Sequence, residues 1–305
     1  MLAIVCPGQG SQTPGFLSAW IEDPTTAAHL VRLSDAVGRD LTQLGTTADE
    51  DTIKDTAVAQ PLIVAAGVLT ARALFGDNLP AGAVVAGHSV GEITASALTG
   101  ALSEADAMNF VTVRANGMAQ AAQAVPTGMS AVLGGDPDEV RAAIVAAGLT
   151  PANENGGGQI VAAGSLEQLA AFAENPPAKT RVIALKVAGA FHTEYMSPAV
   201  DALSQLAGAL PTQDPSTTLL SNFDGAQVPS GAANLTSLVA QVTRPVRWDL
   251  CEETMLELGV TGLLELAPSG TLAGLAKRGM KGVKTFALKT PDQLEDARAF
   301  VAEHA

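Results

Sequence analysis

The stretch VVAGHSVGEITASAL, residues 84–98, runs from a β-branched apolar segment through a serine into an alanine-rich helix. Its centre, GHSVG at 87–91, fits the G-x-S-x-G pattern of a nucleophile elbow, in which a strand turns sharply into a helix. Such a turn tolerates only glycine two residues before and after the serine, because a Cβ there would strike the neighbouring strand or helix. The turn also places Ser89 at a helix N-terminus, where oriented N–H groups favour negative charge. We therefore predict that Ser89 is a nucleophile; the alternative is a glycine-rich turn with an incidental serine.

The segments around the elbow predict an α/β fold. The run LAIVC at 2–6 is continuously apolar and ends at Pro7-Gly8, which is typical of a strand buried on both faces, and the run before the elbow is a second such strand. Helical patterns cover about 26–37, 57–74 and 104–122. Buried strands that alternate with helices indicate a parallel sheet, here in a larger α/β-hydrolase-like domain that carries the elbow.

A smaller inserted unit is predicted at residues 126–189. Strand-like and helical segments follow one another there in the order β-α-β-β-α-β, which is the ferredoxin-like pattern. A Gly156-Gly157-Gly158 turn separates the two middle strands. The segments are MSAVLGG 129–135, DPDEVRAAIVAAG 136–148, LTPANEN 149–155, GQIVAAG 158–164, SLEQLAAFAENP 165–176 and TRVIALKV 180–187. The larger domain then comprises residues 1–125 and 190–305.

Composition excludes several classes of partner. The 305 residues include 31 acidic and 17 basic side chains, so the net charge is -14, which argues against nucleic acid or an anionic membrane as the main partner. Cys6 and Cys251 are too few for a disulfide framework or a zinc site, and we expect buried thiols in a reducing compartment and no metal. No signal peptide is expected, and the richest apolar stretch, 57–71, is interrupted by Gln60 and Pro61. We predict a soluble cytoplasmic protein.

A serine nucleophile needs a base, and the chain has four histidines. His88 adjoins Ser89 in a turn where neighbouring side chains diverge, His29 lies in an amphipathic helix, and His304 is the penultimate residue. Elimination therefore favours His192, in the loop AGAFHTEYM that precedes a helix. No acid is clearly placed to orient it, because Glu194 and Asp201 follow on a solvated helix face. We predict a dyad in which a carbonyl oxygen holds the imidazole, with acylation falling as pH drops through ~6.5, the unperturbed histidine pKa.

Arg114 is the second notable position. It shares a helical stripe with Phe110, Val111 and Met118, and an arginine on an apolar stripe is costly unless it meets an anion. An internal ion pair and a bound anionic ligand are both open at this point.

Four motifs together resemble one enzyme family. They are PGQGSQ at 7–12, GHSVGE at 87–92, GAFH at 189–192 and QVTRPVRW at 241–248. The sequence is similar, nearly end to end, to the malonyl-CoA:acyl-carrier-protein transacylases of fatty-acid and polyketide synthesis. The resemblance implies that Ser89 is acylated, that His192 is its base, and that Gln241 orients His192 from its loop in place of an acid. The backbone N–H groups of Gln9 and Val90 would form the oxyanion hole. The family resemblance implies no bound cofactor.

The resemblance also implies the substrates. Malonyl-CoA would donate the acyl group and a holo acyl carrier protein would accept it, with Arg114 binding the free malonyl carboxylate bidentately. Phe191 would crowd the carbon that is branched in methylmalonate. Further substrate-binding positions are expected at Gln60, Met118, Asn153 and Asn155, with Asn222 nearby. Lys277 and Arg278, in a basic segment near the C-terminus, are predicted to dock the carrier, and we expect a monomer.

Three rival functions are considered. A serine esterase or thioesterase of similar architecture would need an acid between Ser89 and His192 or just after it. A patatin-like hydrolase would use an aspartate base, against the GAFH match. A non-catalytic carrier-binding scaffold would not need Ser89, His192 and the GQG loop intact.

Overall fold

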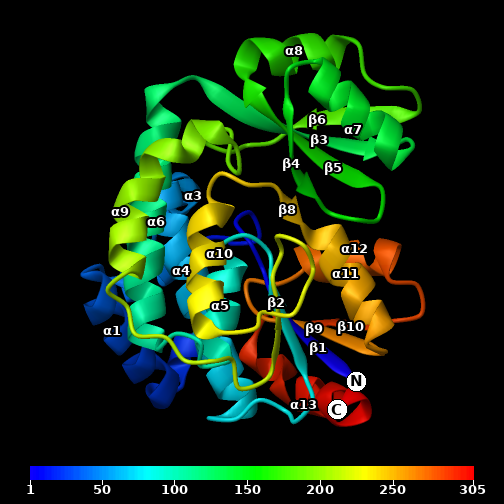
Figure 1. Cartoon of the computed structure of the whole chain (residues 1–305). Helices are drawn as coiled ribbons and strands as arrows, with labels where there is room; N and C mark the ends of the chain where they lie inside the picture. The colour runs from blue at the N-terminus through cyan, green and yellow to red at the C-terminus, as the bar shows by residue number, and fades with distance from the viewer.

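The computed structural model describes residues 1–305 and contains two sheets, one above the other in Figure 1. The larger sheet has five strands in the order β10-β9-β1-β2-β7, and all neighbouring pairs are parallel. Its strands are β1 Leu2–Cys6, β2 Val84–Gly87, β7 Thr218–Leu220, β9 Gly262–Glu265 and β10 Lys284–Ala287. The predicted parallel α/β fold is confirmed.

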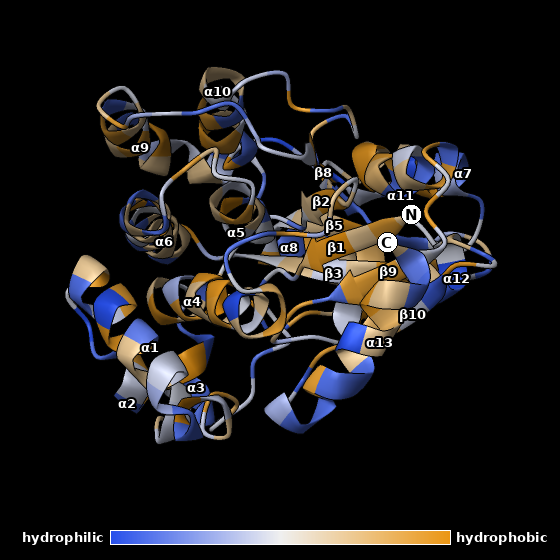
Figure 2. Cartoon of the chain, turned by 90° about the horizontal axis from the view of Figure 1, so that it is seen from below, coloured by the Kyte–Doolittle hydropathy of each residue, from blue (hydrophilic) through white to orange (hydrophobic).

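Both faces of this sheet are covered, which explains why β1 is apolar without alternation. Leu2, Ile4 and Cys6 belong to the main core, whereas Ala3 and Val5 belong to a second core on the opposite face. Figure 2 shows the strands in orange and the outward faces of peripheral helices such as α1 and α13 largely in blue. The main core is covered by α1 Pro24–Val37, α4 Thr56–Phe75, α5 Gly91–Leu98, α6 Glu104–Ala124, α9 Val200–Ala207 and α10 Gly231–Gln241, and the second core by α11 Trp248–Glu257 and α12 Thr271–Gly279.

Short helices complete the larger unit. They are α2 Leu41–Thr46, α3 Glu50–Lys54 and α13 Leu294–His304, with 3₁₀ turns η1 Trp20–Glu22, η2 Glu194–Ala199 and η3 Pro291–Gln293. By length and composition α4 is the one helix that could cross a membrane, and 78% of its most apolar window is buried inside the protein. Such burial is typical of a helix that forms part of a globular core.

The smaller sheet has the order β6-β3-β5-β4-β8. Its first four strands pair antiparallel and, with two helices, follow the predicted βαββαβ order: β3 Thr127–Gly134, α7 Pro137–Ala146, β4 Thr150–Glu154, β5 Gln159–Ser165, α8 Leu166–Glu174 and β6 Thr180–Ala184. Helices α7 and α8 cover one face, with Ile144 and Phe172 in a core of their own. The other face presents Met129 and Val161 to the main core.

The fifth strand of this sheet comes from outside the predicted insertion. β8, Val246–Arg247, pairs parallel with β4, so that Asn153 is opposite Val246 and Glu154 is opposite Arg247. The smaller sheet is therefore tied into the 190–305 segment, and the division of the chain at 126 and 189 stays a prediction.

Candidate active site

Ser89 lies in a strained turn between β2 and α5. Its φ of 53° is in the left-handed region, which residues other than glycine rarely adopt. A Cβ on Gly87 would lie 2.0 Å from the Gly91 carbonyl carbon, and a Cβ on Gly91 would lie 2.1 Å from the Cys6 carbonyl oxygen. The steric reason for glycine at both positions, argued from the sequence, is therefore present in the structure.

His192 reaches this serine from the loop before η2. Its Nε2 lies 2.7 Å from Ser89 Oγ, and its Nδ1 lies 2.9 Å from the backbone carbonyl oxygen of Gln241. Nδ1–H therefore donates to that carbonyl, which leaves Nε2 as the acceptor for the serine proton. One expectation was wrong in its location: Gln241 is the last residue of α10 rather than part of a loop. It holds His192 through its main chain, because the last carbonyls of a helix have no intrahelical partner.

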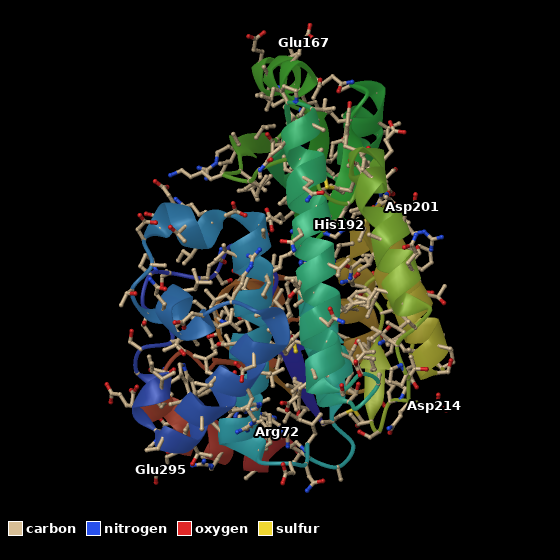
Figure 3. All side chains as sticks on the ribbon, turned by 90° about the vertical axis from the view of Figure 1, so that its left-hand side faces the viewer. Arg72, Glu167, His192, Asp201, Asp214 and Glu295 are labelled. Atoms are coloured by element: carbon tan, nitrogen blue, oxygen red, sulfur yellow. The ribbon has the colours of Figure 1, made fainter.

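No carboxylate orients the imidazole. Glu194 and Asp201 are both exposed, and in Figure 3 Asp201 lies at the outer edge of the molecule while His192 lies inside it beside α6. The arrangement is thus the serine–histidine–carbonyl relay expected from the sequence, without the acid that an ordinary serine hydrolase triad would supply.

The His192 imidazole is kept neutral. Burial lowers its pKa to about 3, and the positive charge of Arg114 acts in the same direction. The sequence-based expectation of an acid limb near pH ~6.5 from this residue, the unperturbed histidine value, is therefore wrong. The neutral form, which is the one that accepts a proton, persists across the physiological range.

His88 forms its side-chain hydrogen bond with a residue other than Ser89, as expected for a structural residue. Its Nε2 lies 2.8 Å from Asn155 Oδ1, its ring packs 5.8 Å from that of Trp248, and burial lowers its pKa. Asn155 in turn donates from Nδ2 to Gln159 Oε1 at 3.0 Å. Asn155 therefore contacts the elbow through His88, where it joins the smaller sheet to the larger one.

Arg114, from the middle of α6, points at the serine. It is 1% exposed, and its Nη2 lies 3.3 Å from Ser89 Oγ. Nη1 donates to Gln60 Oε1 and Nη2 to Gln241 Oε1, both at 2.6 Å, while Nε has no partner. Gln60 Nε2 lies 3.7 Å from the sulfur of Met118.

No carboxylate lies within 4 Å of this guanidinium, so the internal ion pair that the sequence left open is not formed. Burial lowers the Arg114 pKa to about 10, opposed by the charge of Glu92. The group stays protonated at neutral pH. A buried cation whose direct partners are all neutral can receive an anion.

Two unpaired backbone donors lie in the elbow and in the loop packed against it. The loop after β1 packs against it, since a Cβ on Gly8 would lie 3.0 Å from the His88 carbonyl oxygen. The N–H groups of Gln9 and Val90 make no hydrogen bond within the protein. Unpaired N–H groups beside a serine can receive the oxyanion of a tetrahedral intermediate.

The remaining predicted site residues make no hydrogen bond to Ser89 or His192. Phe191 is buried in the main core next to His192, and Asn153 has a buried Oδ1 without a partner. Asn222 donates from Nδ2 to the Gly87 carbonyl at 2.9 Å and so supports the elbow. Lys277 and Arg278 are exposed at the last turn of α12, where cations are favoured in any case. Carrier docking there stays a prediction.

Residues 3–298 match the family model described as an acyl transferase domain. The chain belongs to the acyl transferase family. It is 51% identical over 298 residues, 97% of this chain and 99% of the relative, to the malonyl CoA-acyl carrier protein transacylase of Mycobacterium tuberculosis. The crystal structure of MCAT from the same organism superposes with a TM-score of 0.92 at 50% identity, and covers 98% of this chain and 99% of that one. A type II polyketide acyl-carrier protein complex with its malonyl-transacylase has a TM-score of 0.90 at 30% identity, and covers 98% of this chain and 99% of that transacylase chain.

One residue of this acyl transferase was missed by the sequence reasoning. Glu92, in the first turn of the elbow helix α5, is 4% exposed. Its Oε1 accepts the Asn222 backbone N–H at 2.5 Å, and its Oε2 accepts from Gln241 Nε2. Burial raises its pKa to about 7. The available signal was the one charged residue in the buried-helix segment GEITASAL, since such a carboxylate must find partners.

Proposed function

We propose that the chain transfers a malonyl group from malonyl-CoA to the phosphopantetheine thiol of an acyl carrier protein, through a malonyl ester on Ser89. The observation that carries this is the Arg114 guanidinium, which has no direct ion-pair partner and whose Nη2 lies 3.3 Å from Ser89 Oγ. In malonate the free carboxylate is separated from the reacting carbonyl by one carbon. A cation so near the nucleophile therefore fits a short dicarboxylic acyl group. The names of the relatives and the carrier complex of one of them support the same reading.

The reaction follows from the geometry in two matched halves. His192 Nε2 takes the proton of Ser89 as Oγ attacks the thioester carbonyl, and the N–H groups of Gln9 and Val90 receive the oxyanion. Collapse of the tetrahedral intermediate expels CoA, which leaves with the proton from His192. In the second half the carrier thiol gives its proton to His192, its sulfur attacks the malonyl ester, and Ser89 regains the proton. A thioester is consumed and a thioester is formed, so the chemistry is close to isoenergetic.

The proposed function predicts an isolable intermediate that prefers thiol to water. Brief exposure to malonyl-CoA should add one malonyl mass to the protein, because the first half-reaction leaves the malonyl ester on Ser89 until a thiol accepts it. Holo carrier should remove this mass within seconds, whereas buffer alone should remove it far more slowly. Intact-mass spectrometry with and without carrier measures both rates. Loss to water as fast as loss to carrier would identify a thioesterase instead.

Arg114→Ala should change acyl selectivity. A charge-assisted fork contributes roughly 1.5–3 kcal/mol, so malonyl transfer should fall by about 10²-fold. Acetyl transfer should fall much less, because the acetyl group has no free carboxylate to pair with the guanidinium. The measurement is the ratio of kcat/KM for malonyl-CoA over acetyl-CoA in wild type and variant. An unchanged ratio in a folded variant would mean that selectivity lies elsewhere.

We also propose a docking surface for the carrier, a cellular location and an oligomeric state. The carrier would approach the exposed cations Lys277 and Arg278, a local exception to the overall net charge of -14. Cys6 and Cys251 are free and buried, which suits a reducing cytoplasm. Each active-site group described above comes from one chain, so we propose a monomer as the working unit.

A further inference from the structure

The side-chain amide of Gln241 lies between a buried cation and a buried acid. Its Oε1 accepts from Arg114 Nη2 at 2.6 Å. Its Nε2 donates to the Ser89 carbonyl oxygen at 3.0 Å and to Glu92 Oε2. The opposite orientation of the amide would point an NH₂ group at the guanidinium and an oxygen at two acceptors, so the surroundings allow only one orientation.

Glu92 supports that orientation together with Arg114 and the Ser89 carbonyl, and it does so fully only as an ionised carboxylate. Oε1 accepts the Asn222 backbone N–H and Oε2 accepts from Gln241, so both oxygens face donors. A protonated carboxyl or a glutamine has one acceptor end and one donor end. The amide of a glutamine would set a donor against a donor, and a protonated carboxyl would weaken one of the two acceptors, so either change makes a buried hydrogen bond poorer.

The neutral amide also keeps the acid and the cation apart. Glu92 lowers the electrostatic cost of burying Arg114 through its charge, yet no direct ion pair forms between them. A carboxylate in direct contact would occupy the guanidinium and compete with the malonyl carboxylate. An amide oxygen orients the same group and leaves its charge for the ligand.

We propose that Glu92 is a positioning residue for acyl selectivity, an inference that rests on the proposed function. Through the Gln241 amide it holds the Arg114 guanidinium oriented and unpaired beside Ser89, ready for the malonyl carboxylate. Glu92 touches neither the substrate nor the reacting atoms, and its effect should therefore fall on malonyl more than on acetyl.

The ionisable groups around Glu92 allow a pH test. Arg114 faces it from α6 and stays charged, Cys251 faces it from α11 as a neutral thiol whose pKa burial raises, and neutral His192 lies beyond the Gln241 carbonyl. Burial raises the Glu92 pKa to about 7, so the carboxylate takes up a proton as pH falls through 7 and loses one acceptor. The malonyl-over-acetyl ratio of the wild type should therefore fall between pH 8 and pH 6.

Two variants test the mechanism with the full-length protein. Glu92→Gln resembles the protonated state, so its malonyl-over-acetyl ratio at pH 8 should fall by roughly tenfold and should no longer change with pH. The double variant Glu92→Gln with Gln241→Glu exchanges the two groups. Its new carboxylate accepts both from Arg114 and from the amide introduced at position 92, while the oxygen of that amide accepts from Asn222. The Ser89 carbonyl loses the amide donor at position 241, while the contacts to Arg114, to position 92 and to Asn222 are kept. Arg114 is now ion-paired, so the ratio should fall by about 10²-fold, as in Arg114→Ala.

Each outcome decides the inference. A wild-type ratio that is flat between pH 6 and pH 8, or Glu92→Gln lowering both acyl substrates equally, would overturn it, as would a double variant that keeps wild-type selectivity. A wild type that forms no malonyl adduct on Ser89 would instead overturn the proposed function itself. The two failures are thus distinguishable.

Discussion

Ser89→Ala is expected to lower kcat/KM for malonyl transfer by roughly 10⁴-fold or more, the usual loss when the nucleophile of such a relay is removed. His192 and Arg114 would remain in place, but no oxygen would lie 2.7 Å from His192 Nε2 to carry the acyl group. No malonyl mass should appear on the protein. Peptide mapping of wild type should place the adduct on the peptide that contains Ser89.

Two cysteines serve as the internal control for this result. Cys6 and Cys251 are buried, and burial raises the pKa of both thiols, so neither should be acylated. An adduct on either cysteine would overturn the serine mechanism. Ser89→Gly is the matched variant for the fold: glycine adopts a φ of 53° without strain, so it should be at least as stable as Ser89→Ala in thermal unfolding while being equally inactive.

His192→Ala should cost a similar factor, on the order of 10³–10⁶ in kcat/KM, because no other group within reach of Ser89 Oγ can accept its proton. In wild type the imidazole should not limit the rate as pH falls, since its pKa of about 3 keeps it neutral throughout the range in which the protein is assayed. A titration near pH 7 should instead follow Glu92. Acetyl transfer, which has no carboxylate for Arg114, should show that limb only weakly.

The matched control for this variant is His88→Ala. His88 hydrogen-bonds to Asn155 rather than to the serine, so its loss should reduce stability more than it reduces the rate. Rates should be compared on protein whose folded fraction is known from circular dichroism. If His88→Ala in folded form loses as much activity as His192→Ala, the assignment of the base is wrong.

The parts of the site that the sequence could predict belong to a recurring local pattern. Gly87 is required by contacts within the turn, whereas Gly91 is required by the close approach of Cys6 on strand β1, which the nucleophile-elbow pattern predicts. An arginine on an apolar helical stripe predicts an anionic partner, either an acid of the chain or a ligand. His192 could be reached by elimination because only four histidines exist. The carbonyl that holds it could be anticipated as a type of partner.

What could not be predicted depends on tertiary contacts. The low pKa of His192 results from burial and from Arg114, which lies 78 residues earlier in the chain. The partners of Glu92 come from residues 222 and 241, which no spacing rule brings together. The two-residue strand β8 is too short to give a periodic signal, and it pairs with a strand more than ninety residues earlier.

That short strand has a mechanical consequence. Gln241, which anchors His192, precedes Val246 by five residues, and β4 opposite β8 leads directly into Asn155, which anchors His88. A displacement of the smaller sheet would therefore act on the tether of the base and on the elbow at the same time. The position of that sheet and the alignment of the proton relay are mechanically coupled.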